Sequence, residues 1–262
     1  MCIRDRNTNA PLDISSISYS GLVSGDDIGG SFSGAFANKN IGTSKSVTIT
    51  SSYSGVDSGN YSITDQSSTT ANITARTLIV SGITASNKSY DTTTSATLDT
   101  SNVSYAGLVS GDSFSGSYTG AFSSANVGTS KLVTISSLYS GSDLGNYSIT
   151  NQSSTGANII KVSPTISGLS AQSKYSNDNN FILSGTPSIT GLTISYSSSD
   201  TSVATVDSSS AEVSILAIGD TTITASISGN TNYHAASSSY ILTITQRPVS
   251  YTHLTLPTIL LV

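Results

Sequence analysis

An internal repeat constrains this chain more than any other feature. Residues 13–73 align without a gap onto residues 99–159, at an offset of 86 residues. About two-thirds of the aligned positions are identical, as expected of a tandem duplication. The chain is therefore predicted to fold as consecutive copies of one module, in which each copy contacts its neighbours along the chain.

Within each copy, short runs alternate apolar and polar residues between turn residues, the pattern of half-buried antiparallel strands. About seven strands are expected per copy, the number typical of an immunoglobulin-like sandwich. In the second copy these runs are residues 77–84, 95–100, 103–108, 113–122, 131–140, 146–152 and 157–162. Turns are predicted at residues 110–112 and 141–146, where Gly and Asp suit turn geometry.

Composition favours the same fold class. Ser, Thr, Asn and Gly are abundant and disfavour helices, whereas Thr, Val, Ile and Tyr fill the periodic runs and suit strands. With 36% hydrophobic residues in 262 residues, several small cores are expected rather than one large core. The predicted fold class is all-β, with tandem immunoglobulin-like antiparallel β-sandwich modules.

Charge and cysteine content exclude several function classes. A net charge of -5 with 10% charged residues provides no basic patch for nucleic acid. Cys2 is the single cysteine, so neither a disulfide framework nor a cysteine metal site is expected. No apolar run reaches the roughly 18 residues of a membrane span, and no secretion signal opens the chain. The signal of a secreted parent protein would therefore lie outside this fragment.

Both ends break the Ser/Thr/Gly pattern. The first residues, MCIRDR, and the last, VSYTHLTLPTILLV, resemble translated sequencing-adapter sequence that recurs in metagenomic gene calls. Residues 1–6 and 248–262 are therefore interpreted as foreign, which removes Cys2 and His253 from functional argument. The alternative at the C-terminus is a genuine short capping strand.

The first copy, residues 7–76, is predicted to be truncated. It lacks a counterpart of TLIVSGITASNKSYD, with which the second copy opens at Thr77. A sandwich without its opening strand is expected to fray and to expose the adjoining sheet edge.

The second copy, residues 77–162, carries a family resemblance. ITASNKSYDTTTSATLD, followed by GLVSGD, GAFSSANVGTSKLVTI and NYSIT, resembles the YDG repeat of large bacterial adhesins and filamentous-haemagglutinin-like surface proteins. The hallmark residues are Lys88, Tyr90 and Asp91. Thr92 replaces the glycine that usually follows the aspartate, so this turn is expected to be less well defined.

Residues 163–247 change in texture and resemble a bacterial immunoglobulin-like (Big-type) domain, through SSDTSVATVD and GDTTITA. The alternation of apolar and polar residues predicts that the apolar side chains of this segment form one core between two sheets. The expected core residues are Ile194, Tyr196, Val203, Val206, Val213, Ile215, Ile223 and Ala225.

The sequence shows no recognisable set of catalytic residues. Outside the foreign tail the one histidine is His234, and without helices a nucleophile elbow is not expected. Aspartates recur near glycines, but their spacing forms no calcium loop, so they are predicted to hydrogen-bond their own backbone. These are Asp26, Asp27, Asp57, Asp112 and Asp143. No catalytic residue, cofactor site or metal site is assigned, and the chain is predicted not to be an enzyme.

Two further chemistries remain open. A Lys–Asn isopeptide crosslink needs an acid beside the pair, and candidate residues of all three kinds recur at equivalent positions of the two copies. Solvated lysines and turn asparagines explain the same residues. The candidates are Lys45 with Asn60 and Asp57, and Lys131 with Asn146 and Asp143. A sugar site could use exposed tyrosines, but recurrence in both copies favours packing, with the hydroxyl at the rim. The recurring tyrosines are Tyr19, Tyr53, Tyr61, Tyr105, Tyr139 and Tyr147.

The resemblance implies an extracellular, cell-surface location and a structural or adhesive stalk that spaces a distal binding region from the cell. Its expected partners are neighbouring repeats of the same chain, with surface glycans or other cells as further candidates. One alternative is a carbohydrate-binding accessory module of a secreted hydrolase. A second is an adhesin domain that contacts a ligand directly.

Overall fold

The computed structural model describes residues 2–3 and 7–249, and across them the regular structure is β-strand plus two single-turn 3-10 helices, η1 (Ser58–Asn60) and η2 (Leu144–Asn146). The chain forms two compact units. The first comprises residues 1–86, 94–123 and 130–157, and the second comprises residues 87–93, 124–129 and 158–262. No described residue belongs to an α-helix, so the all-β prediction is confirmed.

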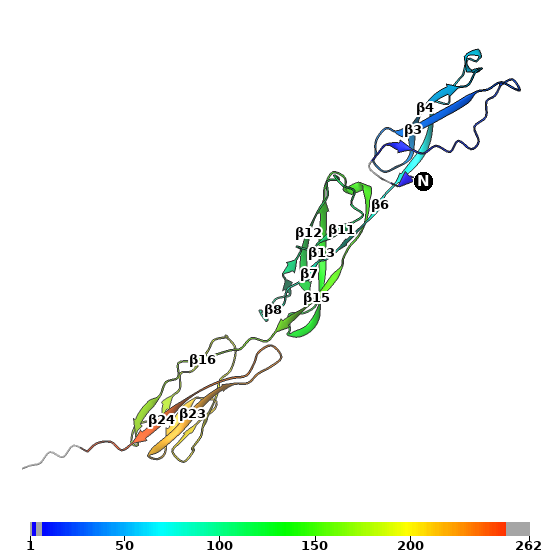
Figure 1. The fold of residues 1–262 in the computed structure, drawn as a ribbon. Helices are drawn as coiled ribbons and strands as arrows, with labels where there is room; N and C mark the ends of the chain where they lie inside the picture. The colour runs from blue at the N-terminus through cyan, green and yellow to red at the C-terminus, as the bar shows by residue number, and fades with distance from the viewer. Residues whose placement is uncertain (1, 4–6, 250–262) are drawn as a thin grey trace, which may run out of the picture. The chain divides into compact units, whose positions relative to one another are not determined.

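The first repeat, in the first unit, forms one five-stranded sheet in the order β1-β5-β4-β3-β2, and its two long central strands, β3 and β4, are labelled in Figure 1. Its strands are β1 (Cys2–Ile3), β2 (Asn9–Ala10), β3 (Gly29–Phe36), β4 (Gly42–Ser54) and β5 (Ser68–Thr74). Phe36 and Val47 pair across the β3–β4 hairpin and are buried with Ala10 and Ile73. Although Cys2 and Ile3 were expected to be foreign, they pair in parallel with the end of β5.

The first repeat does not form a second sheet in its described residues. Residues 18–20 and 61–64, the counterparts of two strands in the second repeat, have no strand structure. Their partner would be the opening strand that this repeat lacks. Ile14 and Val23 remain 53% and 61% exposed, so these apolar side chains of the first repeat lie largely outside its core.

The second repeat forms more than one sheet, and every predicted run contains a strand. The strands that lie wholly or mostly in the first unit are β6 (Arg76–Ser81), β7 (Thr84–Ala85), β9 (Ser95–Ala96), β10 (Leu98–Asp99), β11 (Ser104–Ala106), β12 (Ser115–Phe122), β13 (Gly128–Ser140), β14 (Tyr147–Thr150) and β15 (Ser154–Ile160). The first residues of β13 and the last residues of β15 belong to the second unit. One sheet has the order β11-β6-β14, another continues β15-β13-β12-β9, and β7 pairs with β10. β15 extends into the second unit, where it pairs with β8 (Lys88–Ser89).

The burial of β6 follows its sequence alternation. Leu78 and Val80 are 0% and 2% exposed, whereas Ile79 between them is 47% exposed. Alternate side chains of a strand face opposite sides of the sheet, so Leu78 and Val80 enter the core together. Most strand pairs of this repeat are antiparallel, but β6–β14 and β8–β15 are parallel pairs. A parallel pair needs a long connection, and the intervening hairpin and turns supply one here.

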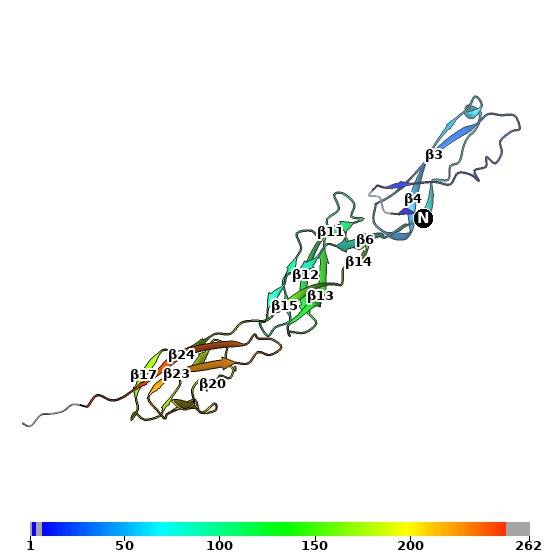
Figure 2. The ribbon, with the colours of Figure 1, turned by 60° about the horizontal axis from the view of Figure 1, so that its bottom comes forward.

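The third module, in the second unit, contains two larger sheets, β17-β24-β23-β20 and β18-β22-β21, and a short pair, β16-β19. The strands are β16 (Ile166–Ser167), β17 (Gln172–Tyr175), β18 (Phe181–Ile182), β19 (Thr186–Pro187), β20 (Ser195–Ser198), β21 (Ala204–Val206), β22 (Glu212–Ile215), β23 (Gly219–Ile227) and β24 (Ala236–Thr245). β23 and β24 lie side by side in both views (Figures 1 and 2).

The predicted core of the third module is largely correct. Val203, Val213, Ile223 and Ala225 are buried, and three more residues pack against the core, namely Tyr196, Val206 and Ile215. Ile194 is half-buried. The prediction omitted the contribution of β24, where the buried residues are Tyr240, Leu242 and Ile244.

Candidate functional site

The hallmark residues of the second repeat form a closed hydrogen-bonded turn in the second unit. The Lys88 ammonium donates to Asp91 Oδ1 (2.7 Å), to the Thr93 carbonyl (2.8 Å) and to Thr93 Oγ1 (3.0 Å). Asp91 also accepts the Thr93 backbone N–H at 2.9 Å. Thr92, at the tip, has a φ of 68°. The turn is thus well defined, contrary to expectation, and its left-handed tip explains why glycine is usual there.

We expect Thr92→Gly to stabilise the second repeat by about 0.5 to 1 kcal/mol, since relief of left-handed strain exceeds the entropic cost of glycine. The matched control is Thr94→Gly, two residues further along the chain. The measurement is the midpoint of urea unfolding. A lower midpoint for Thr92→Gly than for the parent would contradict the expectation.

Acid should open the same turn. The Lys88 ammonium, together with the backbone and hydroxyl of Thr93, lowers the pKa of Asp91 from 3.8 to about 2. A lowered folded pKa contributes stability that is present above the unfolded pKa and is lost as the pH falls through the folded value. Asp91→Asn should therefore lower the urea midpoint at pH 5, and the difference from the parent should shrink towards pH 2. A difference that does not depend on pH would contradict this assignment.

An aspartate and a tyrosine close the Ser-Gly-Asp loop in each repeat. In the second repeat the Tyr147 hydroxyl donates to Asp112 Oδ2 (2.6 Å) and accepts the Val109 N–H (3.0 Å). Asp143 accepts the Ser113 N–H at 3.0 Å. These contacts recur in the first repeat, where the corresponding residues are Tyr61, Asp26, Val23, Asp57 and Asp27. We call this arrangement the Asp–Tyr clasp.

The clasp accounts for the aspartates that were considered as calcium ligands. The Asp26 and Asp112 carboxylates accept a hydrogen bond from the tyrosine hydroxyl. The Asp57 and Asp143 carboxylates accept the backbone N–H of Asp27 and Ser113, whereas the sequence predicted bonds to the aspartates' own backbone. Within residues 2–3 and 7–249, no group of three or more His, Cys, Asp or Glu side chains is arranged to hold a metal ion.

In the first unit, the loop of residues 37–41 lies on the clasp of the second repeat. Lys39 Nζ is 3.5 Å from Asp112 Oδ1 and 3.6 Å from Asp143 Oδ1. The Ile41 N–H donates to Asn146 Oδ1 at 3.0 Å. Asn146 is only 5% exposed, so the acceptor side of this part-buried hydrogen bond is shielded from water, and the bond joins two repeats of the chain.

The second unit contains the same hydrogen bond between the tip of the second repeat and the third module. The Val127 N–H donates to Asn232 Oδ1 at 3.0 Å, again across 105 residues. Asn232 Nδ2 donates to Asn126 at 3.2 Å. The Tyr90 and Tyr233 rings meet edge to face, with centroids 5.4 Å apart.

Sequence reasoning missed this use of asparagine, although a signal was present. An Asn-Tyr dipeptide occurs at residues 60–61, 146–147 and 232–233, at the repeat offset of 86 residues. The third copy lies outside the aligned duplication, in a module of different texture. Its recurrence at the same offset indicates a role at module junctions rather than within one module.

The other residues considered for catalysis or crosslinking do not lie together as reactive groups among the described residues. His234 is exposed, and its backbone N–H donates to the Val162 carbonyl at 2.9 Å. The Lys45 ammonium hydrogen-bonds Asn38 Oδ1 and the Asn40 carbonyl, whereas an isopeptide crosslink would require it at Asn60. Lys131 lies on β13.

Aromatic side chains gather inside the second repeat. Phe114 stacks on Tyr139 at a centroid distance of 5.3 Å, and Tyr105 meets Phe114 edge to face at 5.1 Å. The Tyr105 and Tyr118 hydroxyls are 3.1 Å apart. Burial and the Tyr105 hydroxyl raise the pKa of Tyr118. Tyr139 departs from the prediction of a hydroxyl at the rim, because its hydroxyl is buried without a hydrogen-bond partner.

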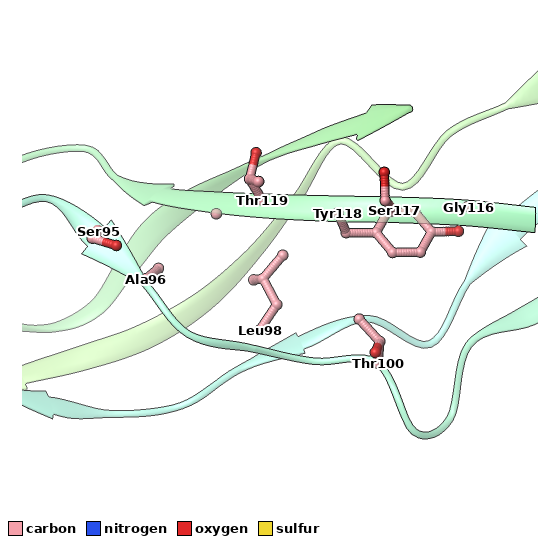
Figure 3. A pocket seen from close by; sticks show the side chains of 9 residues that line it. Ser95, Ala96, Leu98, Thr100, Gly116, Ser117, Tyr118 and Thr119 are labelled. Atoms are coloured by element: carbon pink, nitrogen blue, oxygen red, sulfur yellow. The ribbon is translucent and has the colours of Figure 1, made fainter. Parts of the chain in front are cut away.

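An open groove of about 370 Å³ runs beside these residues. Figure 3 shows Leu98, Thr100 and Tyr118 along it, with Ser117 and Thr119 on β12. The side chains that line the groove are apolar, hydroxyl-bearing or absent, and none is charged. The groove therefore has no carboxylate, histidine or lysine side chain in its lining to act as a general acid or base.

The fold defines an all-β protein built of consecutive modules of mostly antiparallel β-sheet. The profile of the YDG domain matches residues 5–71 and 74–156, and the chain belongs to the YDG domain family. That match does not extend over residues 163–247, whose Big-type resemblance stays a prediction. No curated protein matches the chain. None of the described helices is long and apolar enough to cross a membrane.

Solved structures show only distant likeness. The Drosophila N-cadherin EC1-3 structure is 7% identical, with 78% of this chain and 77% of that chain covered and a TM-score of 0.29. Surface layer protein SbsC, domains 1-6, is 14% identical, with 95% and 40% covered and a TM-score of 0.26. A SusE-like surface located polysaccharide binding protein of Bacteroides thetaiotaomicron is 8% identical, with 86% and 56% covered and a TM-score of 0.24.

Proposed function

We propose that this chain is part of a structural or adhesive stalk in a large secreted or cell-surface bacterial protein, where its modules space a distal binding region from the cell. The observation that carries the proposal is the recurrence of clasp and junction residues at one period. A module that joins its neighbours by backbone N–H and asparagine side chains can be added or removed without redesign of its core.

The domain organisation belongs to the same proposal. It comprises a truncated YDG repeat at residues 7–76, a complete repeat at residues 77–162 and a Big-type domain at residues 163–247, with foreign residues 1–6 and 248–262. Of the residues interpreted as foreign, 1, 4–6 and 250–262 lie outside the described residues. Neighbouring repeats are the proposed partners, the proposed location is extracellular, and no catalytic role is assigned.

The experiment adds whole repeats to the chain. Copies of residues 77–162 are inserted after Val162, and the maximum dimension in solution is measured by small-angle X-ray scattering for zero, one and two insertions. A spacer is expected to lengthen by the same increment with each insertion. A dimension that hardly grows with added mass would contradict a spacing role.

The competing assignment is a carbohydrate-binding module, and it predicts a different observation. A sugar ring would have to stack on an exposed aromatic face, and the groove offers the part-buried Tyr118, whose hydroxyl already meets Tyr105. A glycan array without hits supports the stalk. Specific glycan binding that Tyr118→Ala abolishes, with the fold intact by circular dichroism, would replace the stalk by this assignment.

A further inference from the structure

The first repeat carries a second copy of the junction surface. Asp26, Asp57 and Asn60, here called the acceptor face, are the counterparts of Asp112, Asp143 and Asn146. Asn60 is exposed, whereas Asn146, which accepts the Ile41 N–H, is 5% exposed. The same residue type at the same repeat position is therefore buried where a loop lies on it.

The acceptor face already has the internal geometry of the occupied copy. Tyr61 donates to Asp26 and accepts the Val23 N–H at 3.1 Å, as Tyr147 does with Asp112 and Val109. Asp57 accepts the Asp27 N–H at 2.9 Å. In the second repeat these internal bonds coexist with the approach of Lys39 to both carboxylates, so they orient the aspartates without using their full accepting capacity.

The charges at the occupied junction indicate which kind of loop fits the acceptor face. Where the receiving module has Asp112 and Asp143, the arriving loop has Lys39. At the junction with the third module, Ala125 replaces the lysine, and Ser198 and Gly229 stand at the positions 86 residues after the two aspartates. Lysine and the aspartate pair are thus present together at one junction and absent together at the other. The asparagine bond is common to both.

We propose that the acceptor face is a docking site for the lysine-bearing loop of another YDG repeat, placed before the first repeat in the chain. The ammonium of that loop lies between Asp26 and Asp57, and Asn60 Oδ1 accepts the N–H of the residue at the Ile41 position. This docking is independent of the stalk function, because the same contacts would join repeats in a glycan-binding protein.

The test extends the full chain by one period, with a second copy of residues 7–92 placed before Asn7. This insertion supplies the first repeat with its missing opening strand and with a preceding loop. With isotope labels confined to the added copy, hydrogen exchange of its Ile41 amide is measured by NMR. We expect Asn60→Ala in the original repeat to speed this exchange about ten-fold, the effect of losing one shielded hydrogen bond.

Matched controls keep the result decisive. Asn60→Ala in the added copy, where no loop precedes it, should leave the exchange rate unchanged. Lys39→Ala in the added copy lies on an exposed loop and should speed the exchange without affecting the fold. In the unextended chain, Asn146→Ala gives the reference effect on Ile41. If Asn146→Ala speeds exchange while neither substitution at the new junction does, the docking site is refuted, whatever the outcome of the scattering experiment.

Discussion

Leu78→Ala is expected to lower the free energy of unfolding of the second repeat by about 3 kcal/mol, within the range for large-to-small substitutions in cores. Leu78 is 0% exposed on β6, the strand that holds β11 and β14 in one sheet. Truncation leaves a cavity where this strand meets the core. Native-state hydrogen exchange of the β13 amides reports unfolding of this repeat separately from the third module.

Ile79→Ala is the matched control for this substitution. Ile79 lies next to Leu78 on the same strand but points outward and is 47% exposed. Its truncation removes a similar number of atoms with much less buried contact, so we expect a loss below about 1 kcal/mol. Equal losses at the two positions would show that β6 does not present one face to the core.

Gly141→Ala should unfold the clasp of the second repeat, at a cost of about 3 kcal/mol for the strained backbone and the displaced neighbour. Gly141 has a φ of 132°, and an added Cβ would lie 2.2 Å from the Ser113 carbonyl oxygen. The backbone must move, which breaks the hydrogen bond between Asp143 and the Ser113 N–H. The measurements are the urea midpoint and hydrogen exchange of the Ser113 amide.

Gly145→Ala provides the control in the same turn. No heavy atom lies within 4 Å of the position that its Cβ would take, and its φ is not in the left-handed range. We expect a change below about 0.5 kcal/mol, as for surface substitutions away from special features. A Gly141→Ala protein with unchanged exchange at Ser113 would refute the close approach of the two loops.

Much of the architecture could be predicted from local patterns. Alternation placed strands at all the predicted runs of the second repeat, because the side-chain period of a strand appears directly in the sequence. Turn chemistry at residues 110–112 and 141–146 agrees with the positive φ of Gly111 and Gly141. The opening strand of the first repeat has no counterpart in the sequence, and residues 18–20 and 61–64, the counterparts of two strands of the second sheet, have no strand structure.

Other features could not be predicted from local patterns, because they depend on contacts between residues far apart in the chain. The parallel pairing of β14 with β6 joins Tyr147 to Arg76, and no local pattern specifies the partner of a strand. The turn at Thr92 was expected to be loose, but Lys88 crosses it to Asp91 and Thr93 and holds it in place. A side chain that reaches across a turn overrides the preference of the residue at its tip.

The sequence by itself determined the period, the all-β class and the residue types that recur at each junction. Only the tertiary structure decided which recurring residues join modules, because Asn146 and Asn232 acquire their partners across 105 residues, when a loop of the preceding module reaches them. An asparagine in a turn has the same sequence signature whether its amide faces water or a neighbouring backbone N–H. Burial makes the difference, and burial is a property of the assembled modules.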